Sequence, residues 1–245
     1  MINEKKKYHI LQLGCASNQA DGIKIANRLI EMNNSIVDNP KEADVIIVMS
    51  CGFSKKQYAD TLTEISEMNK LKPNKSELWV GGCIPAINKK FTSELSFKVD
   101  KYFLPRNFEK HFNISNNTKL FEKNKIQDIL KIKLNSFPIR VSNGCNENCS
   151  YCVIKRAGGK TKSKTITEII NEINNLDNKI NSISLVGEEI GSYGTDIGLN
   201  VFELVKEIVK IKPNIKISFS AIHPKYFIKD FENYVELFKL KALLI

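Results

Sequence analysis

The residues of this chain that are best suited to chemistry are three cysteines grouped in its second half. Cys145, Cys149 and Cys152 lie in the run GCNENCSYC, with three and then two residues between them. A [4Fe-4S] cluster normally takes four thiolate ligands, so a loop that offers three leaves one iron open to a small molecule. The C-x3-C-x2-C spacing therefore predicts a cluster at which catalysis can take place.

The alternative for this triplet is structural zinc, which short cysteine clusters often bind. Zinc would need a fourth ligand nearby. The nearest histidines along the chain are His111 and His223, and neither is near the triplet in sequence. We therefore favour iron–sulfur over zinc.

The other three cysteines, Cys15, Cys51 and Cys83, are far apart in sequence but share a local context. They follow the short apolar runs YHILQL, VIIVM and LWV. Helical patterns at Gly22 to Met32 and Lys56 to Lys70 separate these runs, which predicts a β-α-β-α-β order and a buried parallel sheet. Ligands bind beyond the carboxyl ends of strands in such sheets, so we expect the cysteines to converge. Three unrelated buried cysteines are the alternative.

Four motifs carry a family resemblance: LGCASNQAD around Cys15, ADVIIVMSC ending at Cys51, GGC at Cys83, and GCNENCSYCVI. In this order, along nearly the whole chain, they resemble the radical S-adenosylmethionine (SAM) methylthiotransferases, the family of tRNA 2-methylthioadenosine synthases. The resemblance implies two [4Fe-4S] clusters, one on each triplet. It also implies that SAM binds the open iron of the second cluster, with Tyr151 of the superfamily's aromatic-Cys ending at the cofactor.

The resemblance implies an α/β fold, with an amino-terminal parallel-sheet domain at residues 1–112 and a partial radical SAM (βα) barrel at 137–245. The polar stretch 113–136 is predicted to be the linker. Strands are expected at Ile139 to Ser142, Ser182 to Val186 and Lys216 to Ser220. Helices are expected at Thr167 to Leu176, Val201 to Lys210 and near Asp230 to Lys239.

The chain stops where a fourth barrel strand should start, so we expect a truncated barrel with an open edge strand. Such an edge favours pairing with a second copy or with a partner chain that completes the barrel. A fragment of a degraded gene and one half of a split enzyme are the other interpretations.

Two further residues follow from the radical SAM resemblance. The loop after the second barrel strand approaches the methionyl group of SAM in that superfamily, so Gly187 and Glu188 are expected to bind SAM, with Glu188 receiving its ammonium group. A solvated turn carrying Glu188 and Glu189 is the alternative. The run SYGTDIG from Ser192 resembles a Y-G-x-D element of the family. Lys164 departs from the family's arginine and lacks its bidentate fork.

The resemblance implies that a methylthio group is added to a hypermodified adenosine of tRNA. The 37 basic against 27 acidic residues, a net charge of +10, favour such a phosphate-rich partner. The alternatives are a radical SAM enzyme that acts on a ribosomal protein or peptide, and a non-catalytic iron–sulfur or zinc-binding fragment. An electron donor such as flavodoxin or ferredoxin is also expected. Reduced thiolates predict a cytoplasmic location, and we expect no membrane partner.

Overall fold

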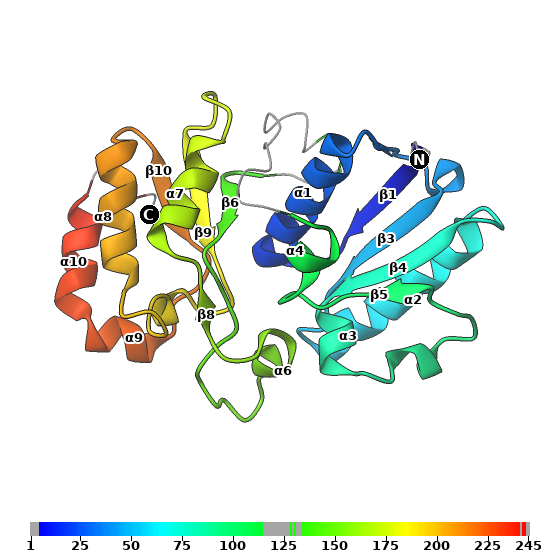
Figure 1. The fold of residues 1–245 in the computed structure, drawn as a ribbon. Helices are drawn as coiled ribbons and strands as arrows, with labels where there is room; N and C mark the ends of the chain where they lie inside the picture. Colours follow the sequence, from blue (N-terminus) through cyan, green and yellow to red (C-terminus); the bar gives the residue numbers. More distant parts are fainter. Residues whose placement is uncertain (1–4, 115–127, 129, 131–133, 241, 244–245) are drawn as a thin grey trace.

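The computed structural model describes residues 5–114, 128, 130, 134–240 and 242–243 (Figure 1). Most of the predicted linker at 113–136 lies outside the described residues. Within the described part, no helix is both long enough and apolar enough to cross a membrane.

A five-stranded parallel sheet forms the amino-terminal half, in the order β2-β1-β3-β4-β5. Its strands are β1 (Lys7–Gln12), β2 (Ser35–Ile36), β3 (Val45–Ser50), β4 (Glu77–Gly82) and β5 (Lys101–Tyr102). Its helices are α1 (Ala16–Glu31), α2 (Lys55–Leu71), α3 (Cys83–Ile87) and α4 (Phe108–His111). The predicted β-α-β-α-β order is confirmed.

The central strand β3 is apolar throughout because both faces of this sheet are covered. Val45, Ile47 and Met49 belong to one hydrophobic core, whereas Ile46 and Val48 belong to a second core on the opposite face. Residues of α1 join the first core and residues of α2 the second. The sheet is therefore fixed between two helical layers, with its strand ends left open for ligands.

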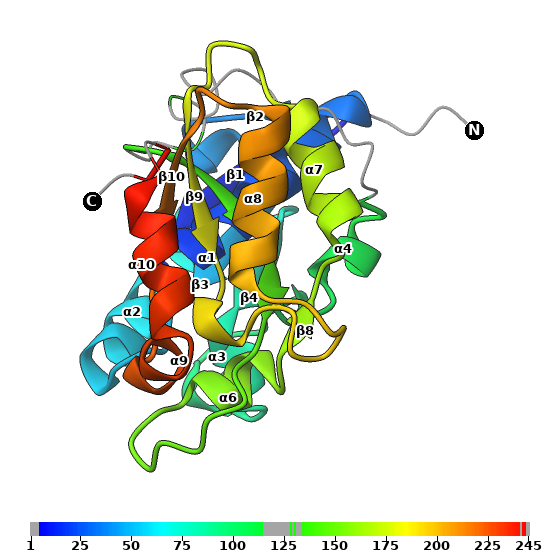
Figure 2. The same cartoon turned by 90° about the vertical axis from the view of Figure 1, so that its left-hand side faces the viewer.

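A second parallel sheet has the order β10-β9-β6. Its strands are β6 (Phe137–Arg140), β9 (Ser182–Val186) and β10 (Lys216–Phe219). The helices α7 (Ile166–Asn174), α8 (Val201–Ile211) and α10 (Phe231–Lys239) lie along it (Figure 2). Further short elements are β7 (Ser142–Asn143), β8 (Lys162–Ser163), α6 (Ile154–Gly158) and α9 (Pro224–Lys229). This arrangement confirms the α/β fold with a partial barrel.

Helix α1 lies between the two sheets and joins them into one molecule (Figure 1). Its Ile23, Ile25 and Leu29 share a hydrophobic core with Phe137 and Ile139 of β6. Both sides of α1 are covered, so even the polar Ser17, Asn18 and Asp21 in its first two turns are buried. The cysteine-bearing ends of the two sheets are therefore held in a fixed relation.

The structure corrects the expected start of the first helix. The apolar pattern predicted a start at Gly22, whereas α1 begins at Ala16, directly after Cys15 in an extended conformation. The segment 16–21 (ASNQAD) is mostly polar, so its hydrophobic periodicity is weak, although Ser17, Asn18 and Asp21 are buried. The short helices α6 and α9 were also not predicted, since five and six residues carry too little periodicity.

Candidate active site

Cys15, Cys51 and Cys83 lie together at the carboxyl edge of the first sheet. Cys15 precedes the first residue of α1, Cys51 follows β3 directly, and Cys83 is the first residue of α3 after β4. Because β1, β3 and β4 are neighbours in the sheet, these positions share one edge. All three cysteines line one cavity of about 370 Å³.

Buried hydrogen bonds hold this edge in place. The Asn18 side chain of α1 donates from Nδ2 to the Ser50 carbonyl oxygen at 3.1 Å, next to Cys51. Ser50 Oγ in turn donates to the Gly81 carbonyl and accepts from the Ile84 N–H at 3.1 Å, on both sides of Cys83. One polar chain thus links the segments that carry the three cysteines.

Two thiols of the first triplet need a bound cation to become anionic. Burial raises the pKa of Cys51, and burial together with Cys15 and Cys51 raises the pKa of Cys83 to about 12. Such thiols stay neutral at pH 7 unless a metal displaces their protons. Among the described residues, no three His, Cys, Asp or Glu side chains lie close enough to share one ion. Each thiolate of a cubane binds a different iron, so a cluster would not require the three thiols to converge on one ion.

The second triplet sits on the loop between β7 and α6 and lines a separate cavity of about 510 Å³. The loop is held by backbone hydrogen bonds from Cys145 N to the Gly159 carbonyl at 3.0 Å and from Cys152 N to the Cys149 carbonyl at 3.1 Å. The Glu147 N–H points at Cys145 Sγ, 3.4 Å away. Burial raises the pKa of Cys145, and this N–H···S contact opposes that rise. The cavity has the size of a cofactor site.

Gly144 gives this loop its shape. Its φ of +80° lies in the left-handed region, and a Cβ there would stand 2.3 Å from the Lys160 carbonyl oxygen. Only glycine permits this turn and this close approach. The loop is also tied to α9, because Glu147 accepts hydrogen bonds from Lys225 Nζ at 3.1 Å and Tyr226 Oη at 2.9 Å.

The two cavities adjoin, since Phe53, Ile154 and Glu188 line both of them. Phe53 follows β3 and is 65% exposed. Tyr151, the predicted SAM contact, is 86% exposed at the second cavity only. A ligand in one cavity therefore lies beside the other cysteine triplet.

Glu188, which was predicted to bind SAM, lines both cavities, and its carboxylate also has partners within the protein. Glu188 accepts hydrogen bonds from Arg140 Nη1 at 2.9 Å and from the Gly144 N–H at 2.8 Å. Both carboxylate oxygens are therefore engaged within the protein. Gly187 lines the cavity of the first triplet, and a Cβ there would stand 2.7 Å from Ser142 Oγ. The adjacent Glu189 lines the second cavity and accepts from the His223 N–H at 2.9 Å.

The Y-G-x-D element has a structural role in the fold. Tyr193 is fully buried and donates from its hydroxyl to the Lys164 carbonyl at 3.0 Å. Asp196 accepts from the Ser163 N–H at 2.9 Å. The departure at Lys164 is also accounted for, because its ammonium pairs with Glu172 at 3.0 Å inside the protein.

Sequence reasoning missed Arg140 and Asp21, which form a buried ion pair between the two sheets. A signal existed for Arg140, since a charge inside the apolar strand FPIRV requires a buried partner. Phe53 was also missed, because one aromatic residue after a strand carries no pattern.

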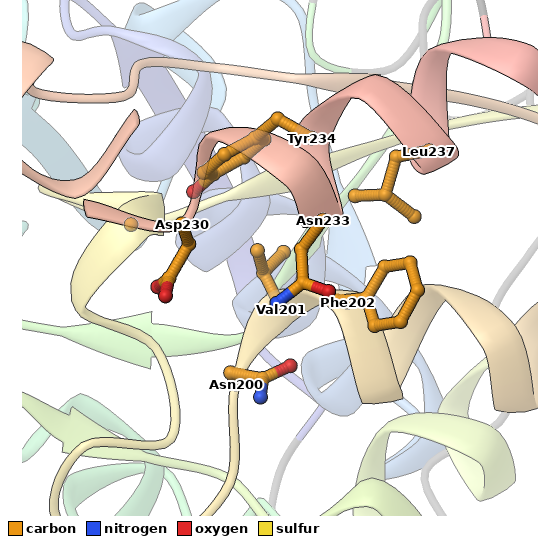
Figure 3. Close-up of a pocket in the computed structure, with 8 residues that line it drawn as sticks. Asn200, Val201, Phe202, Asp230, Asn233, Tyr234 and Leu237 are labelled. Atoms are coloured by element: carbon orange, nitrogen blue, oxygen red, sulfur yellow. The ribbon is translucent and has the colours of Figure 1, made fainter. Parts of the chain in front are cut away.

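A further cavity lies where α8 and α10 begin, lined by Asn200, Asp230 and Tyr234 among others (Figure 3). Its volume of about 10 Å³ holds roughly one water molecule. No cysteine lines it. It is therefore too small for a cofactor.

Comparison with known proteins agrees with this geometry. Residues 7–103 match the Uncharacterized protein family UPF0004, and residues 139–242 match the Radical SAM superfamily. A solved structure of a cobalamin-dependent S-adenosylmethionine radical enzyme, OxsB with aqua-cobalamin bound, has a TM-score of 0.55 at 11% identity. It covers 94% of this chain and 42% of that chain, and it supports the fold alone.

Curated relatives indicate which kind of radical SAM protein this chain resembles. The ribosomal protein uS12 methylthiotransferase RimO of Clostridium novyi is 31% identical over 208 residues, which cover 78% of this chain and 46% of the relative. The corresponding protein of Carboxydothermus hydrogenoformans is 30% identical, with 89% and 53% covered. A tRNA-2-methylthio-N(6)-dimethylallyladenosine synthase of Caldicellulosiruptor saccharolyticus is 28% identical, with 91% and 51% covered.

These matches define a radical SAM protein, a class that uses SAM with a [4Fe-4S] cluster. The chain belongs to the radical SAM methylthiotransferase family, as the motif resemblance predicted. It spans about half the length of the curated relatives that it matches.

Proposed function

We propose that this chain is a radical SAM methylthiotransferase that carries two [4Fe-4S] clusters and acts on a ribosomal protein. The observation that carries the proposal is the pair of adjoining cavities, each lined by one cysteine triplet. A reaction that needs both a sulfur donor and a radical generator requires two such sites beside one substrate.

In this proposal Cys15, Cys51 and Cys83 hold one cluster and the second triplet holds the catalytic one, with SAM beside Tyr151. When bound, the clusters and SAM would supply the sulfur, the methyl group and the radical that together replace a C–H bond by a C–S–CH3 unit. The chain's residues orient these groups and limit water through the apolar Phe53 and Ile154, which line both cavities. A protein donor such as flavodoxin or ferredoxin supplies the electron.

The choice of substrate rests on the relatives named for ribosomal protein uS12. The second candidate is a modified adenosine of tRNA, favoured by the net charge of +10 and by the relative named for that reaction. The proposal includes the division into residues 1–112 and 137–245, and a cytoplasmic location, where cysteines stay reduced.

Anaerobic reconstitution with iron and sulfide tests the two sites separately. The unmodified chain is expected to hold about eight irons and to form 5′-deoxyadenosine from SAM after reduction. Cys149→Ala should keep about four irons and lose SAM cleavage. Cys51→Ala should also keep about four irons and still cleave SAM, without methylthiolation. Unchanged SAM cleavage by the Cys149→Ala variant would contradict the assignment of the second triplet.

The substrate is tested by incubating the reconstituted chain with ribosomal protein uS12 or with unfractionated tRNA lacking methylthio groups. Mass spectrometry of the digested protein and of the nucleosides then locates the added methylthio group. Modified protein supports the first candidate, and modified adenosine alone would replace it with the second.

A further inference from the structure

One buried network joins the two cysteine sites through the protein itself. Arg140, at the end of β6, is 2% exposed. Its Nε donates to Asp21 Oδ1 at 2.7 Å and its Nη2 to Asp21 Oδ2 at 2.9 Å. Asp21 lies in α1, the helix that begins directly after Cys15. The guanidinium thus makes a bidentate contact across the interface between the sheets.

The third nitrogen of the same guanidinium serves the second site. Arg140 Nη1 donates to Glu188 Oε1 at 2.9 Å, and to Asn143 Oδ1 at 2.7 Å. The other oxygen of Glu188 accepts from the Gly144 N–H at 2.8 Å, directly before Cys145. The path from the Cys15 helix to the Cys145 loop therefore contains only charge-assisted hydrogen bonds.

A buried charge network of this kind is costly unless each member is paired. Most of the interface between the two halves consists of packed apolar residues. Apolar side chains could therefore join the two halves without a buried charge. This network differs from an apolar contact because its last hydrogen bond, from the Gly144 N–H to Glu188, reaches the backbone of the cysteine loop. This position explains why a charged residue occupies an otherwise apolar strand.

We propose that Arg140 is a positioning residue that fixes the Cys145 loop relative to the Cys15 helix through Asp21 and Glu188. The inference rests on the proposed two-cluster function, which gives the fixed relation a purpose. In this role, the carboxylate of Glu188 positions the loop rather than binding the ammonium group of SAM.

Hydrogen–deuterium exchange tests this coupling without any cofactor, by comparing the metal-free wild-type chain with metal-free variants. Asp21→Asn keeps the shape of the side chain but removes its charge, and it lies far from the loop in sequence. We expect amide exchange in the peptide spanning residues 143–149 to rise about tenfold, because a charge-assisted buried hydrogen bond is weakened. Arg140→Lys should give the same rise, since a lysine cannot make the forked contact.

Glu172→Gln is the matched control. It breaks the other buried ion cluster between the halves, where Lys24 Nζ lies 2.8 Å from Glu172 Oε2, and that cluster makes no described hydrogen bond to the Cys145 loop. It should leave exchange of residues 143–149 unchanged. Wild-type exchange in Asp21→Asn, or an equal rise in Glu172→Gln, would overturn the proposal.

Electron paramagnetic resonance of the reconstituted chain provides a spectrum that a general loss of stability would not change. The spectrum of the reduced cluster on the second triplet should change in Asp21→Asn and remain that of wild type in Glu172→Gln. An unchanged Asp21→Asn spectrum would contradict the positioning role. If exchange and spectrum respond as expected but no substrate is methylthiolated, the proposed function fails and the positioning role stands.

Discussion

At the scale of single residues, the loop of the second triplet depends on a backbone conformation that one atom can block. Gly144 and Gly198 both have positive φ, at +80° and +71°. A Cβ at Gly144 meets the Lys160 carbonyl, whereas a Cβ at Gly198 meets nothing within 4 Å. Alanine at Gly198 therefore tests backbone strain alone, whereas alanine at Gly144 tests the same strain together with a steric collision.

We expect Gly144→Ala to abolish iron binding at the second triplet, because the collision displaces the segment that carries Cys145. Gly198→Ala adds only the left-handed strain, about 1 kcal/mol, and should keep both clusters. Iron content after anaerobic reconstitution measures the difference. Full iron content in Gly144→Ala would show that the loop does not need this turn.

At the scale of elements, the barrel helices begin at well-formed caps that fix where the adjoining loops leave. Thr165 caps α7 and Asn200 caps α8, each in a reciprocal capping box with a glutamate three residues on. The Asn200 cap comes shortly after the segment Tyr193 to Asp196, which holds the strand β8.

Asn200→Ala should lower the free energy of unfolding by about 1 kcal/mol, because the N–H of Glu203 loses its side-chain acceptor. Asn200→Ser should retain most of the stability, since serine caps a helix equally well. Chemical denaturation under anaerobic conditions checks both variants. Equal stability of the alanine and serine variants would argue against a capping role.

At the scale of the whole molecule, α1 and two ionic contacts hold the halves together. Besides the Arg140 network, Lys24 of α1 pairs with Glu172 of α7, and Lys164 pairs with the same carboxylate. Burial alone would raise the pKa of Glu172. The two ammonium groups outweigh burial and lower that pKa below its usual value of 4.5.

A lowered carboxyl pKa makes the interface acid-sensitive. The unfolded chain binds the proton more readily than the folded one, so this contribution to stability is complete above about pH 4.5 and is lost as pH falls through the lowered folded pKa. Glu172→Gln should cost about 3 kcal/mol at neutral pH, because a buried ammonium loses its partner. Its stability should also fall less steeply below pH 4.5 than that of wild type.

Denaturant unfolding at a series of pH values measures both effects. Surface carboxylates that titrate in the same range affect wild type and variant equally, so the difference between the two curves isolates Glu172. Parallel curves would mean that the pKa of Glu172 is not lowered by its lysine partners.

The sequence by itself determined the local structure and the chemistry of this protein. The apolar runs before Cys15, Cys51 and Cys83 encode buried parallel strands, and strand order then places the cysteines at one edge. The spacing of the Cys145 loop and the order of the motifs were sufficient for the family. These features depend on contacts between near neighbours in the chain, or on rules that hold for every parallel sheet.

Only the tertiary structure decided how the two sites adjoin and which partners Glu188 has within the protein. Asp21 and Arg140 are 119 positions apart, and their contact depends on how α1 packs between the sheets. No periodicity or spacing encodes such a pairing, since it results from side chains of both halves filling one core. The same packing gives Glu188 its partners within the protein.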